Sequence, residues 1–508
     1  MRTKKFLFNI LSNLLSQLAL FAFGIVFPKL IIGRYGSVVN GIISVSGQVV
    51  GYFTYIEAGI SSAAIYLLIR YLASHDTKNM NALLSKNFRL YLGFGACYFV
   101  VLLLFSLLYP LCVDLGSFSK IDTFLLIFVI CLAGFFDFVT LGRYRVLLTA
   151  DQKGYIISFS ALVAYIICAS LSILFIYLGF NIVWVKFPLI FQSFLRSGFL
   201  YLYVKRKYPD ASFSSHDSYQ MPRFANGDAT LFQISRNISV TLPIVLISFF
   251  SLENASVFSV YNSIFSGITG VIAIFTSGSS SSFGDVIVRK QNDILKTSFA
   301  IFEFGIFLIM GYFFSITIVT LDSFIENYTR NFDVNYADSV LAILLVAWGM
   351  FQNSRIPYAT LINASGKYNK MRLTSISQII LLIVLGLVLT IYFGEYGMAC
   401  AMIASSAFGL FFVMLQSYRF VYRFSIKSFV LHFLSCLVCI VRYYFISRIA
   451  VLSCRPASLW EWFLFAFVVS LIEIPFCLFI FVLFDFPLAK MSFKRLKELI
   501  KIKKRPSK

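Results

Sequence analysis

Charged residues are scarce in this chain of 508 residues, making up only 13% of it. A water-soluble domain needs roughly a quarter of its residues charged, so the composition excludes a soluble protein. Hydrophobic residues make up 59% of the chain, and the mean hydropathy is +0.85. Apolar runs long enough to cross about 30 Å of hydrocarbon recur along the whole sequence. The sequence therefore predicts an integral membrane protein.

The sequence also lacks the features of an enzyme. Its longest loop, residues 205–228, is too short to fold as a catalytic domain. The three histidines are far apart and show no metal-ligand spacing, and Gly366-Lys367 lacks the upstream glycine of a phosphate-binding loop. We therefore expect no enzymatic activity, no cofactor and no bound metal. Cys436 and Cys439 lie in an apolar run, so we interpret them as small hydrophobic fillers.

The apolar runs predict an all-α integral membrane fold with about 14 transmembrane helices. The expected spans are 7–32, 41–69, 88–109, 121–148, 155–179, 183–204, 229–251, 258–283, 298–321, 339–362, 373–393, 397–418, 428–450 and 460–484. The first run follows basic residues and is longer than the apolar core of a signal peptide, with no small-residue cleavage site. We interpret it as an uncleaved helix that starts in the cytosol.

Basic residues gather in alternate loops. Those on the predicted inner side include Arg2, Lys4 and Lys5 before the first span, Arg143, Arg145 and Lys153 near the end of the fourth, and Lys205, Arg206 and Lys207 after the sixth. The outer loops carry only Arg34, Lys120, Arg330, Arg448 and Arg455. This asymmetry predicts a plasma-membrane protein with both termini in the cytosol. The net charge of +21 is spread over short loops, which argues against nucleic acid as a partner.

The C-terminal tail alternates basic residues with Phe493, Leu496, Leu499 and Ile500, at helical spacing. This pattern is typical of an amphipathic helix that lies on an anionic inner leaflet, so anionic membrane lipids are an expected partner. A frayed basic tail is the alternative.

An internal repeat divides the chain. Leu147–Tyr155 aligns with Leu361–Asn369 at a separation of 214 residues, and Pro243 follows Pro28 by 215. Gly51 and Gly59 match Gly270 and Gly278 at a separation of 219. Such a repeat predicts two six-helix lobes in the same orientation, which is a transporter architecture. The expected parts are an N-lobe at 1–204, a cytosolic linker at 205–228, a C-lobe at 229–418, two further helices at 428–484 and a basic tail at 485–508.

Several polar residues within the spans predict a wet central cavity. Gln233 and Asn237 lie on one polar stripe of the seventh span with Arg236 at the edge of that stripe, and Asn13 and Gln17 lie on one face of the first. Arg355 lies at a similar depth in the tenth span. Polar contacts that hold helices together are the alternative interpretation of these faces.

Other ionisable residues in the spans have different expected roles. Arg442 and Glu473 lie at similar depth on adjacent helices, which predicts a structural ion pair. Lys186 and Arg196 are expected to extend to the membrane surfaces. Glu57 and Asp137 are carboxylates within the first lobe, where a transporter of organic cations would need them.

Several short motifs together resemble the Wzx-type polysaccharide flippases of the multidrug/oligosaccharidyl-lipid/polysaccharide exporter superfamily. The motifs are Phe27-Pro-Lys-Leu30, Tyr35-Gly36, Val39-Asn-Gly41, Glu57-Ala-Gly-Ile60 and Tyr144-Arg-Val-Leu-Leu-Thr-Ala-Asp151. The resemblance covers the first 12 spans, and it departs in the first helix, where several relatives have arginines and this chain has Asn13 and Gln17.

The resemblance implies alternating access and an undecaprenyl-diphosphate-linked oligosaccharide as substrate. Polysaccharide polymerases and glycosyltransferases are then the expected protein partners. Guanidinium groups match diphosphate oxygens, so Arg236 and Arg355 are the expected phosphate contacts. The side chains of Asn13, Gln17, Gln233 and Asn237 are expected to bind sugars.

Two other functions stay open at this stage. An ion-coupled multidrug exporter of the same superfamily would use Glu57 and Asp137. A membrane enzyme such as a repeat-unit polymerase would need a large outer loop, whereas the longest outer loop here, residues 322–338, is short.

Overall fold

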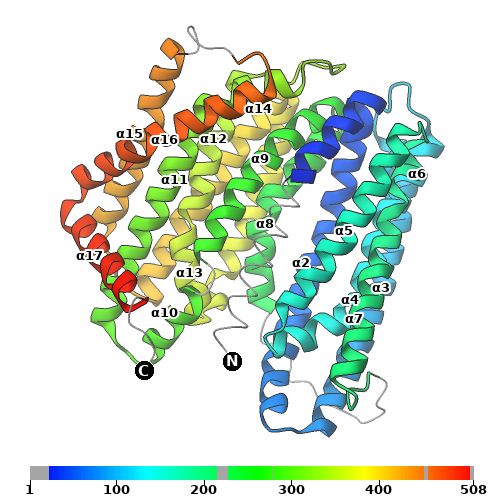
Figure 1. Ribbon diagram of the computed structural model, residues 1–508, viewed down its shortest axis with the longest axis horizontal. Coiled ribbons are helices and arrows are strands. Elements are labelled where there is room, and N and C mark those ends of the chain that lie inside the picture. Colours follow the sequence, from blue (N-terminus) through cyan, green and yellow to red (C-terminus); the bar gives the residue numbers. More distant parts are fainter. Residues whose placement is uncertain (1–21, 214–226, 277–278, 451–455, 504–508) are drawn as a thin grey trace. The chain divides into compact units, whose positions relative to one another are not determined.

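The computed structural model describes residues 22–213, 227–276, 279–450 and 456–503 (Figure 1). Every regular element within these ranges is a helix, which confirms the predicted all-α class. The chain divides into two compact units. The first comprises Met1–Ser263 with Phe332–Val334, and the second comprises Ile264–Asn331 with Asn335–Lys508.

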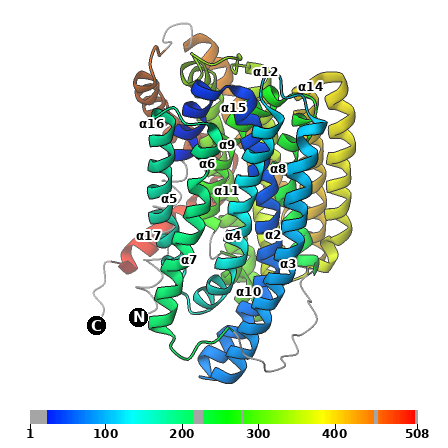
Figure 2. The ribbon, with the colours of Figure 1, turned by 90° about the vertical axis from the view of Figure 1, so that its right-hand side faces the viewer.

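The first unit is built around one central helix, α4. Residues 22–35 are helical, and the helices that follow are α2 (Ser37–Ala73), α3 (Thr77–Cys112), α4 (Lys120–Ala150), α5 (Gly154–Tyr177), α6 (Ile182–Lys186), α7 (Pro188–Lys207), α8 (Gly227–Ser248) and the first half of α9 (Leu252–Thr276). Helix α4 packs against α2, α3 and α7, while α5 packs on α7 and α8 on α2 (Figure 2). The side chains of Asp76 and Ser119 cap α3 and α4 by accepting backbone N–H groups of the first turn.

The second unit is built around the long helix α11. Its elements are the rest of α9, then α10 (Ser279–Val288), α11 (Asn292–Tyr328), α12 (Ser339–Ser354), α13 (Ile356–Ser365), a 3-10 turn (Tyr368–Met371), α14 (Arg372–Phe420), α15 (Ile426–Ala450), α16 (Leu459–Phe484) and α17 (Phe486–Lys503). Helices α15 and α16 both pack against α11, and α12 packs against α14. The two helices that we expected beyond the repeat therefore belong to the second unit.

Helix α14 contains two of the expected spans joined at a sharp break. Gly394 interrupts it with φ 56° and ψ −136°, a conformation that is essentially restricted to glycine. The break falls between the predicted spans 373–393 and 397–418. A single glycine thus turns one continuous apolar run into two helical segments.

The repeat seen in the sequence reappears in the backbone of two turns. Gln152 and Gly366 occupy aligned positions, and both are left-handed, with φ 58° and 67°. His75 and Lys290, which are 215 residues apart, are also left-handed, with φ 54° and 55°. Left-handed non-glycine residues are uncommon, so this agreement is strong support for the repeat.

The aligned lysines beside these turns make equivalent contacts. Lys153 donates from Nζ to the Tyr208 hydroxyl, directly after α7, at 2.8 Å. Lys367 donates from Nζ to the carbonyl of Phe420, the last residue of α14. Each lysine therefore ties the turn after the fourth helix of its copy to the end of the sixth.

Eight helices in the described residues are long and apolar enough to cross a membrane. They include the combined α12–α13 segment and the whole of α14, counted once each. The predicted lobe limits, 1–204 and 229–418, stay predictions.

Candidate functional site

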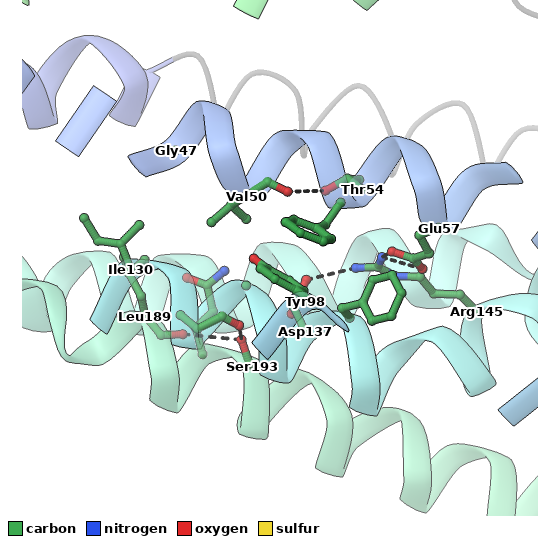
Figure 3. A pocket seen from close by; sticks show the side chains of 15 residues that line it. Gly47, Val50, Thr54, Glu57, Tyr98, Ile130, Asp137, Arg145, Leu189 and Ser193 are labelled. Atoms are coloured by element: carbon green, nitrogen blue, oxygen red, sulfur yellow. Dashed lines mark hydrogen bonds and ion pairs between the residues drawn. The ribbon is translucent and has the colours of Figure 1, made fainter. Parts of the chain in front are cut away.

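A cavity of about 240 Å³ lies inside the first unit, between α2, α3, α4 and α7 (Figure 3). Its lining comes from four helices and includes Gly47, Val50, Phe53, Thr54 and Glu57 of α2, Tyr98 of α3, Ile130, Ala133, Gly134, Asp137, Phe138 and Arg145 of α4, and Leu189, Gln192 and Ser193 of α7. On α2, the residues Gly47, Val50, Thr54 and Glu57 recur at three- and four-residue intervals. Helical periodicity therefore places them on one face, toward the cavity.

Four charged side chains form a network at one end of this cavity. Arg145 donates from Nη1 to both carboxylate oxygens of Glu57, at 3.0 and 2.8 Å. It donates from Nη2 to Asp137 Oδ2 at 3.0 Å. Arg196, on α7, donates from Nη1 to both oxygens of Asp137, at 3.0 and 2.9 Å. Two carboxylates and two guanidinium groups thus alternate in a chain whose formal charge is zero.

The zero formal charge of the network explains why it is stable inside an apolar helix bundle. An isolated charge in hydrocarbon costs several kcal/mol, whereas paired and hydrogen-bonded charges offset much of that desolvation cost. Exposure differs along the network: the side chain of Glu57 is 8% exposed, and that of Asp137 is 28% exposed. Asp137, which both arginines hold, is therefore the member most open to exchange with another anion.

The remaining cavity wall combines aromatic rings with polar atoms. The rings of Phe53 and Tyr98 stack, with centroids 3.7 Å apart and an interplanar angle of 8°. The Tyr98 hydroxyl lies so close to Gly134 that a β-carbon there would be 2.5 Å from it. In the described part of the chain, the Tyr98 hydroxyl and Gln192 Oε1 are buried without a hydrogen-bond partner. Aromatic faces beside available polar atoms suit a polar ligand with apolar faces, such as a sugar.

The structure brings together two of the predicted site residues, Glu57 and Asp137, through Arg145. Asn237 is partly buried on α8. Arg355 is only 2% exposed, between α12 and α13 in the second unit. A β-carbon on Gly409 would lie 2.8 Å from its Nη1 and from Gln378 Oε1, so its guanidinium is packed against α14 in this conformation.

The other predicted contacts fall outside the described residues. Asn13 and Gln17 belong to residues 1–21, and the side chains of Gln233 and Arg236 are likewise outside the description. Their expected roles at the substrate stay predictions.

Sequence reasoning missed the two arginines of the cavity network. We counted Arg145 among the inner-loop charges, but its side chain is only 22% exposed and bound to Glu57. We expected Arg196 to extend to the membrane surface, but Asp137 holds it within the bundle. The signal that could have found them is the balance of charge, since Glu57 and Asp137 lie within the predicted spans at a depth comparable to that of the two arginines.

Three further expectations have clear outcomes. The predicted ion pair is confirmed, because Arg442 Nη2 donates to Glu473 Oε2 at 2.5 Å. The prediction for Lys186 was wrong: it is 9% exposed, with Nζ 5.2 Å from the ring centre of Phe27, so a cation–π contact holds it inside the protein. Cys436 and Cys439 are fully buried, in agreement with a packing role.

Comparison with solved structures identifies the architecture. An inward-facing multidrug resistance MATE family transporter of the MOP superfamily matches with a TM-score of 0.60 and 16% identity, covering 79% of this chain and 93% of its own. The lipid II flippase MurJ, in an inward closed conformation, matches with a TM-score of 0.60 and 14% identity, covering 92% and 98%. A mutant of the Vibrio cholerae MATE transporter VcmN matches with a TM-score of 0.52 and 13% identity, covering 82% and 96%.

The chain has the MATE/MurJ transporter fold. No protein-family model and no curated protein sequence matches it. The structures that share this fold are named as transporters and a flippase, and the match to the flippase extends over more of the chain than the matches to the two MATE transporters do.

Proposed function

We propose that this chain is a Wzx-type flippase that moves an undecaprenyl-diphosphate-linked oligosaccharide from the inner to the outer leaflet of the plasma membrane. The observation that carries the proposal is the pair of arginines, Arg145 and Arg196, held on one carboxylate beside an aromatic cavity. The fold shared with a lipid II flippase over 92% of the chain supports a lipid-linked substrate.

The network offers a way to bind and release a diphosphate. Arginine guanidinium groups bind phosphate oxygens in the two-pronged manner in which they bind a carboxylate. A diphosphate that enters the cavity would compete with Asp137 for Arg145 and Arg196, because Asp137 is the more exposed of the two carboxylates. When the substrate leaves, Asp137 would take its place again and restore a neutral network.

The neighbouring cavity wall would receive the first sugar. The stacked rings of Phe53 and Tyr98 line the cavity, and the Tyr98 hydroxyl and Gln192 Oε1, which are buried without a partner among the described residues, would bind sugar hydroxyls. Arg236, Gln233 and Asn237 on α8, together with Asn13 and Gln17, would extend this polar surface in the proposed lumen. Arg355, in the second unit, would contact a phosphate only after α12 and α13 separate from α14, because it is buried there now.

The rest of the mechanism follows from topology. We place both termini in the cytosol, as the basic inner loops require. The lobes at 1–204 and 229–418 would open alternately to the two sides, and α15 and α16 would flank the path of the lipid tail. Glycosyltransferases would supply the substrate on the inner side, and a polymerase would consume it outside.

An ion-coupled multidrug exporter is the second candidate, because MATE exporters share the fold. Such a protein binds organic cations and needs carboxylates that can receive them. Here both carboxylates of the cavity network are already bound by arginines. This arrangement favours an anionic substrate.

Deleting the gene tests the proposal directly. We expect the deletion strain to lose surface polysaccharide and to accumulate the completed lipid-linked repeat unit on the inner leaflet, with unchanged resistance to cationic drugs. Arg196→Gln should fail to complement the deletion, whereas Arg206→Gln, on the exposed end of the same helix, should complement it fully. Normal polysaccharide with increased drug sensitivity would favour the exporter instead.

A further inference from the structure

Helix α17 starts from a junction that fixes its first turn. Asp485 donates its backbone N–H to the carbonyl of Phe481, and this bond closes the last turn of α16. Its Oδ1 accepts the N–H of Leu488, in the first turn of α17, at 3.2 Å. The other carboxylate oxygen lies 3.5 Å from Nε2 of His432 on α15. The start of α17 is therefore attached to two helices of the second unit.

In residues 486–494 of α17, whose side chains the structure describes, one face packs against the protein. Leu488 and Ala489 are buried, and the helix contacts α11 and α16. On the other side, Phe486 and Phe493 are 61% and 47% exposed, and Lys490 and Lys494 are exposed as well. Large aromatic side chains beside lysines are an unusual surface to leave in water.

The sequence continues this pattern along the helix. Lys490, Lys494, Lys497 and Lys501 follow one another at intervals of four, three and four, which is the spacing of one helical face. Glu498 is the only acidic residue between Phe486 and Lys503. A lysine face next to exposed aromatic residues is typical of helices that lie in the membrane interface.

The end of α16 shows where this surface meets the membrane. Phe479 and Leu483, in its last two turns, are 63% and 68% exposed, as expected for side chains that contact acyl chains. Phe486 comes three residues after Leu483. If these side chains contact acyl chains, helix α17 would begin at the edge of the hydrocarbon layer, at the depth of the phospholipid headgroups.

We propose that α17 is a binding surface for the anionic phospholipid headgroups of the inner leaflet. Lys490 and Lys494 would contact the headgroups, and Phe493 would insert among the upper acyl carbons. The positive charge is the reason to choose anionic lipids, since each lysine near such a surface strengthens binding about fivefold. The proposal is independent of the transported substrate.

Hydrogen exchange of the full-length protein tests this proposal without a label. The protein would be placed in nanodiscs of phosphatidylcholine alone and in nanodiscs that also contain phosphatidylglycerol. We expect amides of residues 490–503 to exchange about tenfold more slowly with the anionic lipid, since several lysines act together. Salt at about 1 M should remove the difference, because it screens exposed charges.

Two triple variants with equal loss of charge complete the test. The tail variant, Lys490→Gln with Lys494→Gln and Lys497→Gln, should lose the lipid-dependent protection. The control, Lys205→Gln with Arg206→Gln and Lys207→Gln at the exposed end of α7, should keep it. Equal exchange in both lipid mixtures, protection that resists salt, or equal loss in the control would each overturn the proposal.

Discussion

Arg145 binds Glu57 through two hydrogen bonds from one guanidinium nitrogen, joining α4 to α2 across 88 residues of sequence. The same guanidinium group also holds Asp137, eight residues earlier on its own helix. Arg145 is therefore the centre of the network, and its loss would leave Glu57 buried without the guanidinium group that hydrogen-bonds it.

Replacing Arg145 should measure this dependence. Arg145→Met should lower the free energy of unfolding by about 3–5 kcal/mol, because removing one partner leaves a buried carboxylate uncompensated. The double variant Arg145→Met with Glu57→Gln should recover most of the loss. Thermal unfolding of the purified protein in nanodiscs gives the comparison. A single variant as stable as the wild type would show that the pair does not contribute to the fold.

Arg236 offers the clearest test of the proposed lumen. Arg236→Ala should abolish transport with nearly unchanged abundance in the membrane, because an arginine in an aqueous lumen contributes little to packing. Arg236→Lys should restore transport only in part, since an ammonium group keeps the charge but loses two-pronged binding. Transport of lipid-linked repeat units and membrane abundance are both measured. A protein that disappears from the membrane, or transports normally, would show that Arg236 is structural.

The topology can be tested with reporters. A reporter fused after Lys508 should behave as cytosolic, and one inserted near Asn331 as external, because the basic loops lie on the side of the termini. Alkaline phosphatase and green fluorescent protein fusions give opposite signals on the two sides. The reverse pair of signals would contradict the orientation.

Gly394 should be intolerant of any side chain. Gly394→Ala should lower the free energy of unfolding by about 1–3 kcal/mol, because its backbone conformation is strained for any residue with a β-carbon. Gly93→Ala, inside α3 with open space around it, is the matched control and should be nearly neutral. Thermal unfolding of both variants measures the difference. If Gly394→Ala is as stable as Gly93→Ala, the backbone at the break in α14 can relax to accept a side chain.

The sequence predicted the parts of the molecule that depend on hydropathy and spacing. Long apolar runs, the repeat and the pair Arg442–Glu473 all follow from local pattern, and the structure bears them out. It did not predict the partners of the buried charges in the first unit. Arg145 lies near the end of α4 and Arg196 in the middle of α7, and only the packing of α4 against α2 and α7 brings both within reach of Glu57 and Asp137.

The paired left-handed turns at Gln152 and Gly366 have a consequence for the origin of the chain. Glycine adopts this backbone conformation readily and glutamine does so only at a cost, yet both copies have the same turn. Such agreement is what a duplicated gene leaves when its two halves diverge. The ancestor would have been a half-length membrane protein that worked as two identical subunits inserted in the same direction.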